Sequence, residues 1–182
     1  DYDALLHFAC KHNTIAKMNY GIGEFVVKGT ELASLALVGP LSKEAIEAFH
    51  SFFSTASHRT IEQDPAFGLR QIVDAAVKAL SPGINDPTTA IHVLGHLSSL
   101  LCTLVDRNPG PRMMTDDDGG VRVVLALPGI EELLHMAVSQ PRLYGAKDPM
   151  VAARLVELLR EVTWCDKDRR YRGALALQLE QL

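Results

Sequence analysis

Two helix starts of the same design lie close together near the middle of the chain. At Asp64-Pro65 and again at Asp86-Pro87, an aspartate precedes a proline. An Asp side chain accepts hydrogen bonds from the free N–H groups of a first helical turn, and Pro is tolerated there because its missing N–H loses no bond. Between the two starts, Ser81-Pro82-Gly83 is typical of a helix end. The sequence therefore predicts a helix over 65–80, a short elbow, and a second helix over 87–106.

Length and composition indicate a soluble globular region. The 182 residues suffice for a substantial core, and the apolar share of 47% and charged share of 22% are ordinary for such proteins. The net charge of −4 argues against nucleic acid as a partner, because phosphate binding needs a basic surface. Three scattered cysteines favour a reducing compartment, and hence a cytoplasmic location. We find no run of roughly 20 apolar residues that would span a membrane, and from the start at Asp1 without a Met we expect a fragment of a longer protein.

We expect an α+β fold that is predominantly helical. Residues 2–11 have helical periodicity, and residues 14–20 and 24–38 have strand character, with glycine turns between and within them. We therefore predict a small β unit with a leading helix over 1–40, built around a barrel-sandwich-like hairpin. It would pack on a helical body over 41–182, which includes one further hairpin over 112–127. The two parts together are expected to form one compact domain.

The remaining helices follow from capping residues and apolar spacing. One helix begins after Ser42 and is expected to bury Ile46 and Phe49. Further helices are predicted over 128–140, from Asp148-Pro149 onward, and from about residue 166 to the end. The helix that begins at Asp148-Pro149 is expected to end at Trp164, whose side chain would pack against the core and anchor that end.

Polar side chains concentrate around the elbow and define the candidate site. A helix N-terminus carries free N–H groups and a partial positive charge, so the start of the helix over 87–106 is a generic anion site. The alternative interpretation is structural: Arg70, Asp74 and Lys78 form an exposed ion-pair ladder, and the elbow residues only cap and turn. The candidate anion-binding residues are Arg59, Gln63, Asp64, Arg70, Asp74, Ser81, Asn85, Asp86, Thr88 and Thr89.

Three other patterns give weaker hypotheses. His92 and His96, in a polar stripe with Ser99 and Thr103, have the i, i+4 spacing of a chelating pair, but no third metal ligand is marked. The three aspartates at 116–118 lack the alternate spacing of a calcium loop and indicate an acidic turn. The glycine spacing over 23–32 resembles half of the hairpin of lipoyl and biotinyl carrier domains, without their lysine-bearing turn. We therefore expect no cofactor and no resident metal.

The run RTIEQDPAFGLRQIVDAAVKALSPGINDPTTA at 59–90, with GEFVVKGTEL at 23–32, resembles a bacterial family of predicted membrane proteins, domain of unknown function 2254. The resemblance is specific over these two stretches, and the order of elements fits most of the chain. It implies membrane-spanning helices before this soluble region in full-length members, and it implies nothing about catalysis. Its recurring positions correspond here to Arg59, Asp64, Phe67, Gly68, Arg70, Asp74, Ser81, Pro82, Gly83, Asn85, Asp86, Pro87 and Thr89.

We therefore expect a non-catalytic domain of an integral membrane protein that forms homo-oligomers or senses a ligand. The full-length protein would lie in the cell membrane, attached through a segment absent from this chain. The alternative is an enzyme or binding protein for a small anionic ligand at the elbow over 81–89. No Ser–His–Asp, Cys–His or paired-carboxylate arrangement can be read from the spacing of the residues, which favours the non-catalytic interpretation.

Overall fold

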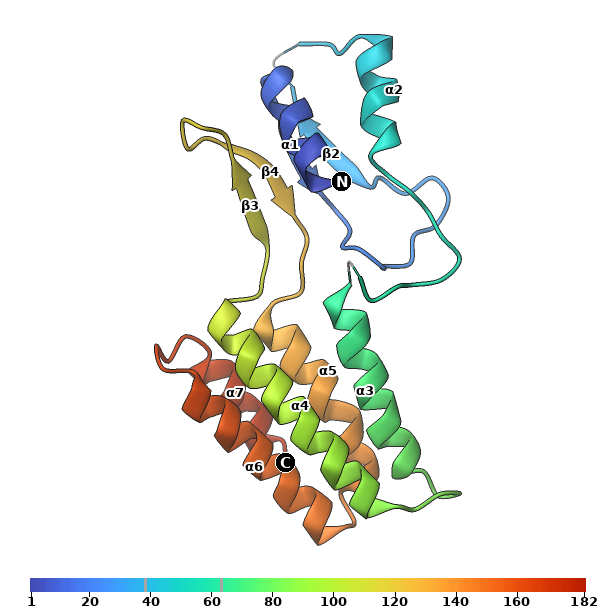
Figure 1. The fold of residues 1–182 in the computed structure, drawn as a ribbon, viewed down its shortest axis with the longest axis vertical. Helices are drawn as coiled ribbons and strands as arrows, with labels where there is room; N and C mark the ends of the chain where they lie inside the picture. Colours follow the sequence, from blue (N-terminus) through green and yellow to red (C-terminus); the bar gives the residue numbers. More distant parts are fainter. Residues whose placement is uncertain (38, 63) are drawn as a thin grey trace. The chain divides into compact units, whose positions relative to one another are not determined.

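A computed structural model describes residues 1–37, 39–62 and 64–182 of the chain (Figure 1). Across these residues, seven helices accompany four strands, which confirms the predicted α+β, predominantly helical class. The contacts divide the chain into two compact units. Residues 1–60 and 110–127 form the first, which we call the sheet unit, and residues 61–109 and 128–182 form the second, which we call the helical unit.

The sheet unit contains two hairpins that share one four-stranded sheet. Its strands lie in the order β2-β1-β4-β3, and the central β1–β4 pair is parallel, whereas the outer pairs are antiparallel. The hairpin at 112–127, predicted within the helical body, therefore joins the N-terminal hairpin through β4. The elements are α1 (Tyr2–Lys11), β1 (Ile15–Met18), β2 (Ala33–Ala36), α2 (Lys43–Ser51), β3 (Arg112–Thr115) and β4 (Val121–Leu125).

Aromatic side chains from two helices form much of the core of the sheet unit. Phe8 of α1 and Phe49 of α2 are both buried, and their ring centroids lie 5.4 Å apart. Val123 of β4 is fully buried in the same cluster. The expectation that Ile46 is buried is wrong, because its side chain is 43% exposed and Ala45 takes the inward position instead.

In its described residues, the helical unit contains five helices that form one bundle (Figure 1). They are α3 (Pro65–Ala79), α4 (Pro87–Arg107), α5 (Ile130–Gly145), α6 (Pro149–Cys165) and α7 (Arg172–Glu180). All three predicted Asp-Pro starts are confirmed. Asp64 accepts from the N–H of Phe67 at 3.0 Å, Asp86 from that of Thr89 at 3.0 Å, and Asp148 from that of Met150 at 2.9 Å.

The core of this bundle takes buried side chains from all five helices. Leu94, Leu97 and Leu101 of α4 are fully buried, as is Leu158 of α6. By length and composition α4 is also apolar enough to cross a membrane, with a mean hydropathy of 1.4, although no long apolar run was expected. A core helix of a soluble protein meets the same criteria, and 33% of the apolar window of α4 is buried within the structure.

The end of α6 differs from the expectation. Trp164 does not anchor the helix against the core, because its side chain is 86% exposed. Asp166 instead holds the following turn, accepting hydrogen bonds from the N–H groups of Arg170 at 3.0 Å and Tyr171 at 2.9 Å. The last helix consequently begins at Arg172 rather than near residue 166. An unexpected aromatic side chain is thus available at the surface of α6.

Candidate functional site

The predicted elbow between α3 and α4 is closed by hydrogen bonds within its own backbone. The carbonyl of Ser81 accepts from the N–H groups of Ile84 at 3.0 Å and Asn85 at 2.8 Å. The N–H of Asp86 donates to the carbonyl of Ala79 at 2.8 Å. Asn85 has a φ of 48°, in the left-handed region that Asn tolerates better than most residues. The elbow is therefore a tight turn with a defined backbone path.

The side chains of the elbow also bond locally. Asp86 Oδ2 accepts from Thr89 Oγ1 at 2.6 Å, in addition to the backbone bond at the start of α4. These hydrogen bonds lower the pKa of Asp86. Ser81 Oγ donates to the carbonyl of Lys78 at 2.7 Å, and Thr88 is exposed. A carboxylate of the chain itself thus occupies the positive end of α4, where an external anion would bind.

The other predicted residues at the start of α3 and within it lie apart from the elbow. Arg70 forms an ion pair with Asp74 at 2.9 Å and donates to Gln140 of α5 at 3.0 Å. Nine residues, or about 13 Å of helix, separate Arg70 from the end of α3. Asp64 caps the opposite end of the same helix, and Arg59 belongs to the sheet unit. Gln63 lies outside the described residues. Anion binding at the elbow remains a prediction.

The histidine pair lies on the surface of α4. His92 and His96 are both exposed, one turn apart. Within residues 1–37, 39–62 and 64–182, no group of three His, Cys, Asp or Glu side chains is placed to hold a metal ion. Metal binding by this pair remains a hypothesis that spacing alone suggests.

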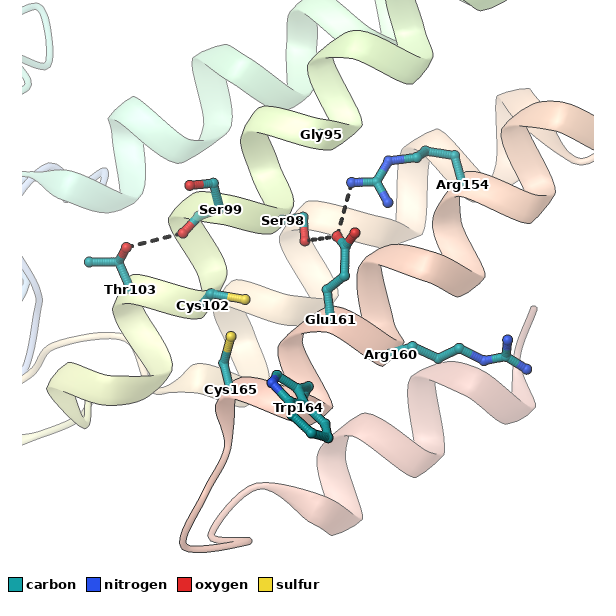
Figure 2. A pocket seen from close by; sticks show the side chains of 10 residues that line it. All are labelled: Gly95, Ser98, Ser99, Cys102, Thr103, Arg154, Arg160, Glu161, Trp164 and Cys165. Atoms are coloured by element: carbon teal, nitrogen blue, oxygen red, sulfur yellow. Dashed lines mark hydrogen bonds and ion pairs between the residues drawn. The ribbon is translucent and has the colours of Figure 1, made fainter.

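A groove between α4 and α6 gathers a different set of polar side chains (Figure 2). Its volume of about 780 Å³ lies within the range of small-molecule sites, roughly 300–1,000 Å³. Its walls combine charged, hydroxyl, thiol and aromatic groups from only two helices. The lining residues are Gly95, Ser98, Ser99, Cys102, Thr103, Arg154, Arg160, Glu161, Trp164 and Cys165.

A charged hydrogen-bond network joins the two walls of this groove. Ser98 of α4, itself 3% exposed, donates a short hydrogen bond to Glu161 of α6. Arg154 donates to the same carboxylate oxygen at 3.0 Å (Figure 2). The bonds from Arg154 and Ser98 together hold the pKa of Glu161 below its usual value. Glu161 is therefore an anion that is fixed at the boundary between α4 and α6.

Small residues on α4 make room for the network. A Cβ atom added at Gly95 would lie 3.8 Å from Arg154 Nη2, so the guanidinium passes close to the backbone of α4. Gly95 faces Arg154, and Ser98 faces Glu161, so residue numbers rise together along the two helices. The helices α4 and α6 consequently run parallel across the groove.

Sequence reasoning missed this groove, although two of its signals are present. Ser98 interrupts the apolar positions of α4 as a buried polar residue. Ser99 and Thr103 of the predicted polar stripe do line the groove. The contact itself joins residues 63 positions apart, so periodicity within one helix does not reveal it.

Comparison with known proteins identifies the family. The profile of a family described as "Predicted membrane protein (DUF2254)" matches residues 1–161. An uncharacterised protein of Mycobacterium tuberculosis is 33% identical over 187 residues, which cover 98% of this chain and 35% of the relative. An uncharacterised protein of Mycobacterium bovis is 40% identical over 121 residues, which cover 66% of this chain and 23% of the relative.

The chain thus spans about a third or less of the length of the curated relatives that it matches. No solved structure matches it. The family match covers most of the chain and agrees with the resemblance of residues 59–90 and 23–32. The chain belongs to the predicted membrane protein family DUF2254.

Proposed function

We propose that this chain is a non-catalytic, ligand-sensing domain of an integral membrane protein, attached to the membrane through a segment outside the chain. Its ligand would be a small anionic molecule with an apolar body, bound in the α4–α6 groove. One observation carries the proposal. Arg160 and Trp164 lie one helical turn apart on the same wall, while the other charges of the groove are already paired.

The balance of charge in the groove favours an anion. Arg154 is held between two carboxylates, Glu161 at 3.0 Å and Glu157 at 3.4 Å. Among the residues that the structure describes, Arg160 forms no ion pair with a carboxylate. Its side chain is directed away from the Ser98–Glu161 contact (Figure 2). One guanidinium thus remains for a charge-assisted hydrogen bond to an incoming phosphate or carboxylate.

The exposed indole favours a ligand that also has an apolar part. Trp164 follows Arg160 by four residues, so the two side chains share one face of α6. Burying a large apolar side chain stabilises by about 1.5–3 kcal/mol, and the 86% exposure of Trp164 leaves most of that contribution unused. A ligand that covers the indole while its anionic group contacts Arg160 would gain both interactions.

A contact elsewhere in the helical unit supports the non-catalytic part of the proposal. Ser139 Oγ lies 3.0 Å from His135 Nδ1, as a nucleophile and its base would. However, the same hydroxyl donates to the carbonyl of His135 at 2.6 Å, one turn earlier on α5. Its proton is directed at the backbone, so the hydroxyl makes a contact with the preceding turn inside α5 and is not an activated nucleophile.

Thermal unfolding in the presence of phenyl phosphate and inorganic phosphate tests the site. We expect phenyl phosphate to raise the melting temperature of the chain more than an equal concentration of phosphate, because only the former covers Trp164. Arg160→Gln should abolish the shift, and the control Arg70→Gln should retain it. No shift with either probe would contradict the proposal. A shift lost only in Arg70→Gln would place the site on α3.

Assembly into homo-oligomers is a second candidate function, and an apolar surface favours it. Leu143, Tyr144 and Met150 are 74%, 48% and 67% exposed where α5 meets α6. Exposed apolar clusters often mark protein–protein contacts. We expect light scattering at micromolar concentration to give a multiple of the chain mass, and Leu143→Glu to reduce it to the monomer. A monomer at every concentration would contradict assembly through this chain.

A further inference from the structure

We infer that Cys102 of α4 and Cys165 of α6 form a covalent modification site, at which a peroxide oxidises the two thiols to a disulfide that links the helices. Figure 2 shows the two sulfur atoms facing each other across the groove. Both residues line the groove, and both are partly exposed. The inference concerns the thiols alone and does not depend on a ligand in the groove.

The parallel packing of α4 and α6 explains why the sulfur atoms meet. Ser98 and Glu161 are already in hydrogen-bond contact between the helices. Residues four positions further along a helix lie one turn above, on the same face. Cys102 and Cys165 are each four positions beyond this contact, so the same packing brings their side chains together. The pair is therefore set by two regular helices and not by a loop.

The two thiols interact directly. Burial and a hydrogen bond with Cys165 raise the pKa of Cys102 to about 12. The thiolate is the nucleophile in thiol oxidation. Whichever sulfur the oxidant reaches first, the other lies beside it and can resolve the product.

The chemistry balances with a peroxide as the oxidant. The thiolate of one cysteine attacks one peroxide oxygen, the O–O bond breaks, and that sulfur becomes a sulfenic acid while the other oxygen leaves as hydroxide and takes up a proton as water. The sulfur of the second cysteine then attacks the sulfenic sulfur, and the S–S bond forms as the S–O bond breaks. The proton of the second thiol leaves with that oxygen as a second water. Two thiols are oxidised by two electrons, and one hydrogen peroxide is reduced to two waters.

Peptide mapping of the folded chain after treatment with hydrogen peroxide tests the inference. Trypsin separates the three cysteines, because Cys10 falls in residues 1–11, Cys102 in 79–107 and Cys165 in 161–167. We expect a peptide that joins 79–107 to 161–167, with a mass about 2 Da below the sum of the two and reversible by dithiothreitol. Cys102→Ser and Cys165→Ser should each lose this peptide, whereas the control Cys10→Ser should retain it.

Treatment in concentrated urea distinguishes the folded geometry from random pairing. Unfolded chains should form links that include Cys10, whereas the folded chain should form only the link between 102 and 165. If the folded chain yields oxidised Cys10 but no link between 102 and 165, the inference is wrong. Equal amounts of all three pairings in the folded chain would also overturn it.

Discussion

Ser98 of α4 donates its hydroxyl hydrogen bond to Glu161 of α6, across 63 positions of sequence. Glu161 also accepts from Arg154, so two donors, one from each helix, share one carboxylate. Arg154 is only 14% exposed, and a partly buried guanidinium needs such a partner. This network fixes the spacing of the walls between which the groove lies.

Glu161→Gln should destabilise the helical unit. The substitution keeps the size of the side chain but removes the negative charge opposite Arg154. We expect the free energy of unfolding to fall by about 1 kcal/mol, since hydrogen bonds to charged groups contribute somewhat more than neutral ones and Glu161 is half exposed. Urea unfolding measures the change. Glu157→Gln is the matched control and should cost under about 0.5 kcal/mol, because Glu157 is 62% exposed. Equal losses in the two variants would show that the network adds nothing.

The stability of the chain should depend on pH through Glu161. Hydrogen bonds from Arg154 and Ser98 lower its pKa in the folded state below the ordinary value of 4.5. The stabilisation that ionised Glu161 gives to the folded state is therefore fully present above the ordinary pKa, and it is lost as the pH falls through the pKa of the folded state. We expect the free energy of unfolding to fall between about pH 5 and pH 3, and to fall less in Glu161→Gln. Identical pH profiles for the two proteins would contradict this assignment.

Asp64→Ala should remove the cap of α3. Asp64 is buried and accepts from the N–H of Phe67 at 3.0 Å, and losing such a cap costs about 1–2 kcal/mol. Asp64→Asn should recover most of the loss, because Asn caps helices as well as Asp does. The comparison is Asp74→Ala, in which an exposed ion pair is lost, with an expected change under about 0.5 kcal/mol. Chemical denaturation measures all three. A loss in Asp64→Asn as large as in Asp64→Ala would point to a role for the charge itself.

Gly145→Ala should destabilise the junction of α5 and α6. A Cβ atom at this position would lie 2.4 Å from Val151 Cγ1 and 3.4 Å from Leu80 Cδ1. Overpacking of this kind costs about 1–3 kcal/mol. Gly173→Ala is the control and should not destabilise the protein. A Cβ atom there meets nothing within 4 Å, and alanine favours the helix. We expect thermal unfolding to show a lower melting temperature for the first variant and an equal or higher one for the second. A neutral Gly145→Ala would mean that Val151 moves aside freely.

Local signals account for what could be predicted from the sequence. A cap depends on residues within one turn, so the starts at Asp64, Asp86 and Asp148 were all predictable from an Asp-Pro pair. The parallel pairing of β1 with β4 was not, since Ala16 finds its partner in Val123 only after the chain folds. A hairpin signal specifies its own turn but not the strand beside it.

The two candidate sites, the elbow and the groove, also differ in how far the sequence could predict them. The elbow was predicted because its turn and cap residues are consecutive in the sequence. In the structure, most of these residues form hydrogen bonds with their near neighbours in the chain. The groove could not be predicted, because it depends on which faces of α4 and α6 meet. Trp164 illustrates the limit. Its apolar character suggested an anchor in the core, whereas its side chain lines the groove at the surface of α6 and is 86% exposed.

Trp164 fluorescence gives the most direct test of ligand binding in the groove, because it is the single tryptophan of the chain. We predict that phenyl phosphate shifts its emission to shorter wavelength in a saturable way, as the indole leaves water. Arg160→Gln should weaken this response at least about tenfold, which corresponds to roughly 1.4 kcal/mol. Emission that stays at the wavelength of an exposed indole throughout the titration would contradict the account, and so would an unchanged response in Arg160→Gln.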